Sequence, residues 1–147
     1  MYKSMNNYQR KVSILLRQFE SCEGNEAIYD KIIEIGKNFD KNISVERAIF
    51  NETHKVLGCQ SSTYLKSEFK EGVLWFTFFS DALISKGLVA ILVSVYNQEL
   101  PEIILKNSPD FLKELGIVGS LTMSRANGLA SAHLKMRQEA LKYLINV

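Results

Sequence analysis

The sequence predicts an α+β domain in which helices cover one face of a small antiparallel sheet of about three strands. Apolar residues recur at helical three-four spacing near both ends of the chain, whereas a central segment is rich in β-branched and aromatic residues. The 147 residues suffice for one ordinary core and are too few for two. Because no repeat, linker or low-complexity tract interrupts the chain, residues 1–147 are expected to form a single domain.

Two helices are expected before the sheet. Residues 7–20 carry a stripe of apolar residues at helical spacing, namely Tyr8, Val12, Leu15, Leu16 and Phe19. Asn25 can cap a second helix. Its inner face is formed by Ile28, Ile32, Ile35 and Phe39. Gly36 is expected close to the C-cap of that helix.

Three strands are expected in the middle of the chain. The segments 54–57 and 63–69 alternate in polarity, and 73–79 is aromatic and β-branched throughout. Lys70-Glu71-Gly72 between the last two reads as a short hairpin turn, in which glycine can adopt a positive φ.

Further helices are expected after the sheet. Ser80 and Asp81 offer N-cap oxygens to an almost wholly apolar helix over residues 82–97, in which Gly87 indicates close approach by a neighbouring element. Pro101 and Pro109 each suit the first turn of a short helix, and Gly116 is expected to end the second. The final helix starts near residue 124. Its broad apolar face comprises Leu129, Leu134, Met136, Ala140, Leu141 and Leu144.

Composition argues against a nucleic-acid surface and a membrane span. Eighteen basic and sixteen acidic side chains leave a formal charge of +2 and form no basic block. The longest apolar run, residues 87–96, is about half of what a bilayer requires. The start of the chain has no export-signal pattern, so a cytoplasmic location with reduced thiols is expected; a transit peptide stays open because no acidic residue precedes Glu20.

One cysteine lies where the chain is expected to bend. Cys59 stands in Gly58-Cys59-Gln60-Ser61, on the connection between the first two predicted strands. Gly58 permits a tight turn, and the Ser61 hydroxyl could donate a hydrogen bond to sulfur. Loop placement makes a thiolate accessible to a partner, although chemistry alone favours an incidental thiol.

Other chemistries have weaker support. A cysteine hydrolase needs a histidine base, but His54 is not expected to aim at the sulfur and His133 is expected to be solvated. Cys22 and Cys59 are too few for a disulfide framework or an unaided zinc site, and no phosphate-binding glycine loop occurs.

Several stretches together resemble the SufE family of sulfur-acceptor proteins. They are GCQSSTYL at 58–65, SDALISKGLVAIL at 80–92 and SRANGL at 124–129, with YDKIIEIGKNF at 29–39 and PEIIL at 101–105 also similar. The resemblance runs from about residue 15 to 142 and implies a fold shared by the SufE and IscU-type families, so residues 1–147 read as one SufE-like domain.

The resemblance implies a carrier and not an enzyme that turns over by itself. A SufS-like cysteine desulfurase, which carries pyridoxal phosphate, would form a persulfide that Cys59 attacks as a thiolate. Cys59 would hold the sulfur as its own persulfide and pass it to a SufBCD-like iron–sulfur assembly complex, while the desulfurase is stimulated. The resemblance implies neither a cofactor nor a metal on the chain itself.

The resemblance also singles out residues around the cysteine. Gly58, Gln60 and Ser61 belong to the cysteine loop, and Asp81 and Arg125 match family positions associated with this loop and the desulfurase surface. A purely structural role, Asp81 as an N-cap and Arg125 in the first turn of a helix, stays open for both.

The chain departs from the family pattern at Thr63-Tyr64, where Val-Trp is usual, and at Phe78-Phe79, where Gly-Asp is common. Cys22 is expected to be a packed residue at a helix end. Three alternatives to the carrier are an IscU-type iron–sulfur scaffold, which uses three cysteines, a cysteine hydrolase, and an adaptor that only stimulates the desulfurase.

Overall fold

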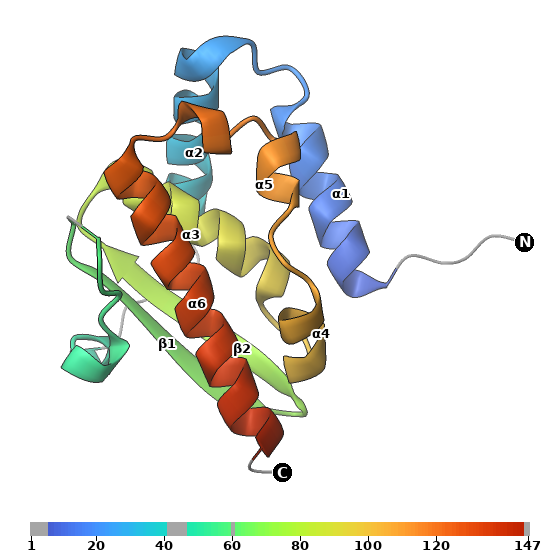
Figure 1. Cartoon of the computed structure of the whole chain (residues 1–147), viewed down its shortest axis with the longest axis vertical. Helices are drawn as coiled ribbons and strands as arrows, with labels where there is room; N and C mark the ends of the chain where they lie inside the picture. The colour runs from blue at the N-terminus through green and yellow to red at the C-terminus, as the bar shows by residue number, and fades with distance from the viewer. Residues whose placement is uncertain (1–5, 41–46, 60, 146–147) are drawn as a thin grey trace, which may run out of the picture.

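The computed structural model describes residues 6–40, 47–59 and 61–145 and confirms the α+β class (Figure 1). The helices are α1 (Asn7–Phe19), α2 (Gly24–Asp40), α3 (Leu83–Tyr96), α4 (Pro101–Lys106), α5 (Phe111–Glu114) and α6 (Met123–Ile145). The strands are β1 (Thr63–Lys70) and β2 (Val73–Ser80), and single 3-10 turns occur at η1 (Arg47–Ile49), η2 (Glu52–His54) and η3 (Val118–Ser120).

The sheet of the described residues is one antiparallel hairpin. β1 and β2 pair from Thr63 opposite Ser80 to Lys70 opposite Val73. The predicted turn is confirmed: Gly72 has a φ of 80° and Glu71 one of 57°, so both residues between the strands are left-handed.

The strand predicted over residues 54–57 is wrong. Only an isolated bridge joins Lys55 to Tyr64, with one further hydrogen bond of 2.8 Å from the Val56 N–H to the Thr63 carbonyl oxygen. Residues 52–54 form η2, and Gly58 turns the chain with a φ of 84°. The extended residues between η2 and the turn at Gly58 are too few to form a strand.

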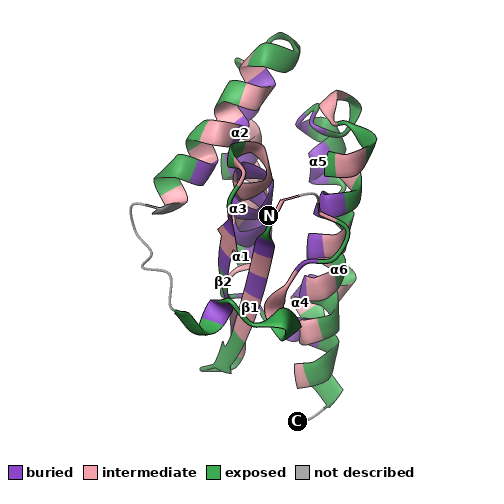
Figure 2. Ribbon diagram, turned by 90° about the vertical axis from the view of Figure 1, so that its left-hand side faces the viewer, coloured by how far each residue is buried: buried purple, intermediate pink, exposed green. Residues whose placement is uncertain are grey.

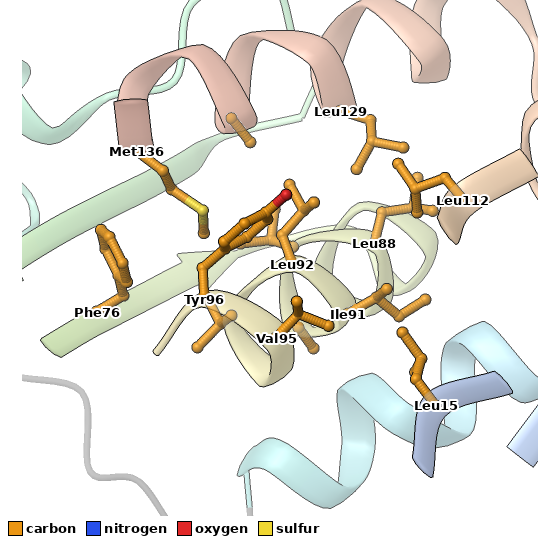
Figure 3. Packing of buried hydrophobic residues seen from close by; sticks show 14 of the residues in the cluster. Leu15, Phe76, Leu88, Ile91, Leu92, Val95, Tyr96, Leu112, Leu129 and Met136 are labelled. Atoms are coloured by element: carbon orange, nitrogen blue, oxygen red, sulfur yellow. The ribbon is translucent and has the colours of Figure 1, made fainter. Parts of the chain in front are cut away.

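Helix α3 is the centre of the core. Ile91, Leu92, Val95 and Tyr96 are completely buried. Figure 3 shows Ile91 beside Leu15 of α1, with Leu92 and Tyr96 on the side of Met136 from α6. In Figure 2 the ribbon of α3 is mostly coloured as buried and lies between α2 and the hairpin. An apolar face on nearly every side of the helix explains this central position.

Close packing of α2 and α3 depends on two glycines. A Cβ at Gly87 would lie 2.1 Å from the Ile32 carbonyl oxygen, which confirms the close approach predicted there. Gly36 is not near a C-cap as expected, because α2 continues to Asp40. A Cβ at Gly36 would lie 2.9 Å from the Gly87 nitrogen, so Gly36 is the partner in the same crossing.

The later helices follow the predictions with two differences. Gly116 ends the α5 segment with a φ of 77°, and Pro101 begins α4, as expected, whereas the helical residues of α5 start at Phe111, after Pro109. The apolar face of α6 is narrower than predicted: Leu134 is 54% and Leu141 47% exposed. Leu144 is likewise exposed. The buried side follows the i, i+4 row of Ala132, Met136 and Ala140, with Leu129 at its start.

Candidate functional site

Cys59 lies where three parts of the chain meet. The connection into β1, the start of α3 and the start of α6 meet there (Figure 1). Gly58 turns the chain with its positive φ, and a Cβ there would lie only 3.2 Å from the Ser131 Oγ of α6. The positive φ of the turn favours glycine at position 58, and a side chain there would also crowd the Ser131 hydroxyl of α6.

The thiol of Cys59 is free and half-buried. Burial raises the pKa of the Cys59 thiol, and a hydrogen bond with the Thr63 side chain opposes this in part. The Ser61 hydroxyl, which was expected to reach the sulfur, lies 3.0 Å from the Thr63 Oγ1. Thr63 Oγ1 in turn lies 3.0 Å from the Ser80 Oγ, so Thr63 connects the thiol to a chain of hydroxyls.

A pocket of about 370 Å³ opens beside the sulfur. Its lining includes Cys59, Ser61, Asp81 and Arg125, four of the residues that the sequence singled out. The other lining residues lie in the family-like stretches 80–92 and 124–129 but were not singled out as site residues: Ala82, Ser85, Leu88, Val89, Ser124, Gly128 and Leu129. Gln60 lies outside the described residues.

Asp81 fastens the cysteine connection to the start of α3. Its Oδ1 accepts a hydrogen bond of 2.9 Å from the Ser62 backbone N–H, and its own N–H donates to the Ser62 carbonyl oxygen at 3.2 Å. The prediction that Asp81 caps α3 is wrong, because the N-cap is Ala82 and no side chain caps the helix. The Asp81 carboxylate accepts a hydrogen bond from the cysteine connection instead.

Arg125 stands exposed in the first turn of α6, as the sequence predicted. Its guanidinium carbon lies 5.7 Å from the centre of the Tyr29 ring, and the Tyr29 hydroxyl donates to the Ser120 carbonyl oxygen. Within the described ranges no carboxylate forms an ion pair with Arg125. The exposed guanidinium of Arg125 is therefore available at the pocket to an approaching anionic group, while the Asp81 carboxylate of the same pocket is hydrogen-bonded to Ser62.

Neither histidine lines the pocket. His133 is not solvated as expected: its Nε2 is buried without a hydrogen-bond partner, and its ring centre lies 5.4 Å from that of Tyr96. Burial lowers the pKa of His133 to about 4, with Arg137 adding to the shift. A hydrolase mechanism would need one of these imidazoles at the thiol, so the geometry argues against it.

Cys22 packs partly buried against the core after α1, as predicted for a helix-end residue. In the part of the chain that the structure describes, no group of three or more His, Cys, Asp or Glu residues could hold a metal ion. No helix among those residues is long and apolar enough to cross a membrane.

The fold and this site define a class of small α+β protein that presents one thiol at a pocket between a hairpin and two helix starts. The model of the SufE family, an Fe-S metabolism associated domain, matches residues 13–140. The chain belongs to the SufE family, which confirms the resemblance found in the sequence.

Two relatives match most of this chain. A SufE-like protein of Synechocystis is 30% identical over 129 residues, which are 88% of this chain and 79% of that protein. The Arabidopsis thaliana SufE-like protein 1, chloroplastic/mitochondrial, is 32% identical over 133 residues, which are 89% of this chain and 35% of that longer protein.

A third relative and a solved structure complete the comparison. The cysteine desulfuration protein SufE of Plasmodium falciparum is 39% identical over 89 residues, 57% of this chain and 36% of that protein. The solution structure of a hypothetical protein from Thermus thermophilus has a TM-score of 0.73 at 22% identity and covers 92% of this chain and 96% of that one. This likeness shows a shared fold.

Proposed function

We propose that the chain is a sulfur carrier, in which Cys59 accepts sulfur from the persulfide of a cysteine desulfurase and passes it to an assembly complex for iron–sulfur clusters. The observation that carries this proposal is the position of the free Cys59 thiol, beside a pocket with neither a histidine base nor a metal-ligand cluster among the described residues. Family membership supports the setting, since the SufE domain is associated with Fe-S metabolism.

The transfer is an exchange between two sulfurs. The Cys59 thiolate attacks the outer sulfur of the desulfurase persulfide, a new S–S bond forms, and the old S–S bond breaks. The desulfurase cysteine leaves as a thiolate and takes up one proton, which balances the proton that Cys59 lost. Nothing is oxidised or reduced overall, so neither an electron donor nor a cofactor on this chain is needed.

The environment of the thiol fits a carrier whose cysteine reacts slowly until the desulfurase docks. A raised pKa keeps Cys59 mainly protonated near neutral pH, which slows its attack and its oxidation. Sulfur transfer then requires that docking of the partner moves the cysteine connection and exposes the thiol.

Exposed apolar side chains beside the pocket support docking of a protein partner. Leu57 is 73%, Leu83 52% and Met123 80% exposed. Each is within two residues of a pocket-lining residue on the cysteine connection, α3 or α6. Large apolar side chains gathered around a reactive group are typical of an interaction surface.

The finer assignments are part of the same proposal. We expect a SufS-like desulfurase that brings its own pyridoxal phosphate, stimulation of that enzyme, a SufBCD-like acceptor, and no catalytic turnover by this chain alone. Residues 1–147 are proposed to act as one domain. The cytoplasm stays a prediction; the Arabidopsis relative is by its name chloroplastic and mitochondrial.

Mass spectrometry after incubation with a SufS-like desulfurase and free cysteine tests the proposal. One added sulfur atom is expected on the Cys59 peptide, lost in Cys59→Ser and kept in the matched variant Cys22→Ser. Sulfur transfer that persists in Cys59→Ser through Cys22 would contradict the assignment. An iron–sulfur absorption band in the purified protein would favour the scaffold instead.

A further inference from the structure

The sulfur of Cys59 lies directly against α6 at Gly128. A Cβ built on Gly128 would lie 2.6 Å from the Cys59 Sγ, a distance that real Cβ atoms do not show. The same Cβ would lie 3.8 Å from both the Cα and the Cβ of Cys59, which is ordinary van der Waals contact. The conflict at position 128 is therefore with the sulfur atom alone.

The backbone gives no reason for a glycine at position 128. Gly128 is inside the 23-residue helix α6 and is not among the residues with a positive φ. Glycine weakens a helix interior relative to alanine. Gly128 is buried, and the three described atoms outside α6 that lie nearest to its missing side chain all belong to Cys59. The space that glycine leaves is thus filled by the thiol.

We propose that Gly128 is a positioning residue for sulfur transfer, whose missing side chain makes the seat into which the Cys59 thiol retracts against α6. The inference rests on the proposed carrier function and deepens it, since it names the feature that keeps the sulfur withdrawn before docking. A side chain at position 128 is expected to displace the sulfur from α6.

Reactivity of the thiol gives the first test. In a Cys22→Ser background, Gly128→Ala is expected to raise the rate of Cys59 alkylation by a bulky reagent about tenfold at neutral pH, because a displaced thiol is more accessible and ionises more readily. The pH profile of alkylation should shift to lower pH, because a displaced thiol is more hydrated.

The matched control for reactivity is Gly119→Ala. A Cβ at Gly119 meets nothing within 4 Å, so this variant should alkylate Cys59 at the unaltered rate. An unchanged rate and pH profile in Gly128→Ala would overturn the proposal.

Stability gives a second test that does not depend on how well Gly128→Ala folds. Cys59→Ala removes the Sγ and keeps the Cα and Cβ, with which a new side chain at position 128 has normal contact. In that background Gly128→Ala is expected to raise the melting temperature by about 2–4 °C, as an improved helix interior would. With Cys59 present, the same substitution should lower it.

A double variant that melts as low as Gly128→Ala, or fails to fold, would overturn the proposal, because the conflict would then not be with sulfur. Folding of the double variant where Gly128→Ala fails would support it. Neither measurement uses a desulfurase. The two proposals can therefore fail separately. An error in the role of Gly128 would show in the alkylation rate and the melting temperature, whereas an error in the carrier function would show in persulfide transfer to Cys59.

Discussion

Asp81 and Ser62 are joined in both directions, by a 2.9 Å bond from the Ser62 N–H to the Asp81 Oδ1 and a 3.2 Å bond from the Asp81 N–H to the Ser62 carbonyl oxygen. Ser62 is the last residue before β1. The pair therefore joins the cysteine connection to the residue before the Ala82 N-cap of α3. Only the first of the two bonds depends on a side chain.

Loss of the Asp81 carboxylate is expected to loosen this connection. Asp81→Ala removes a hydrogen bond worth about 1 kcal/mol at an exposed site. A loss of this size corresponds to an open population about fivefold larger, and the alkylation rate of Cys59 should rise by that factor. Asp81→Asn keeps the acceptor oxygen and is the matched control. Alkylation of Asp81→Ala at the wild-type rate would show that the bond does not restrain the thiol.

Docking of the donor is expected to release the thiol. Cys59 should react slowly with a bulky thiol reagent in the free protein, because burial withdraws it and raises its pKa. Addition of a SufS-like desulfurase without cysteine should raise the rate, measured by labelling in a Cys22→Ser background. Equal labelling with and without the desulfurase would argue against release by a partner.

The apolar rim of the pocket is expected to contribute to desulfurase binding. Leu83→Ser with Met123→Ser removes two exposed apolar side chains beside Asp81 and Arg125 and should weaken binding about tenfold or more, measured by calorimetry. Leu141→Ser is the control, since Leu141 is similarly exposed near the other end of α6. If the Leu83/Met123 double variant and the control lost equal binding affinity, these two side chains would not belong to the desulfurase interface.

The crossing of α2 and α3 is expected to tolerate no side chain at Gly87. In Gly87→Ala the new Cβ would meet the Ile32 carbonyl oxygen at 2.1 Å, and this backbone cannot move without separating the helices. We expect a loss of about 3 kcal/mol or more in the free energy of unfolding, measured with urea. Gly119→Ala, with open space around it, should change stability by less than about 0.5 kcal/mol. Similar losses in both variants would contradict the close crossing.

His133 is expected to make the fold sensitive to acid. Its pKa is about 4 in the folded protein and about 6.5 in an unfolded chain, so the unfolded state binds a proton first as the pH falls. Stability should thus be fully present above pH about 6.5 and decline down to about 4. Because the ring is partly exposed, we expect a decline of only about 1–2 kcal/mol.

Urea unfolding at several pH values measures this decline. In His133→Phe, which keeps a ring against Tyr96, the acid-dependent loss between these two pKa values should shrink by that amount. An unchanged pH dependence in this variant would assign the acid sensitivity to other groups.

Local patterns were enough for most of the secondary structure. The helical spacing around Leu15, the apolar run that contains Ile91, and the hairpin glycine Gly72 each determine an element from neighbours within a few residues. Predictions that needed a distant partner were less successful. The strand at 54–57 is reduced to a bridge, and Leu134 and Leu141 of α6 face solvent, because which apolar residues find a covering element depends on the whole packing.

The site residues, too, were found from local motifs, whereas their contacts were not. The sequence identified Cys59, Gly58, Ser61, Asp81 and Arg125 through their motifs, and all of them lie at or beside the pocket. It did not indicate the contact of the thiol with Thr63, which entered only as a departure from the family pattern. The role of Asp81 was open between cap and loop, because a residue just before a helix can cap it, whereas the Ser62 N–H that the carboxylate binds lies 19 residues earlier in the chain.

By itself, the sequence determined that a cysteine stands at a bend before a strand, in a chain with SufE motifs and a central apolar helix. Only the tertiary structure decided that the sulfur rests on Gly128, that Asp81 holds Ser62, and that Arg125 opens onto the same pocket. Helical and strand periods reflect interactions along the chain. These contacts form between segments apart in the sequence: pairing of β1 with β2 brings Ser62 to Asp81, and packing of α6 brings Gly128 and Arg125 to the cysteine connection.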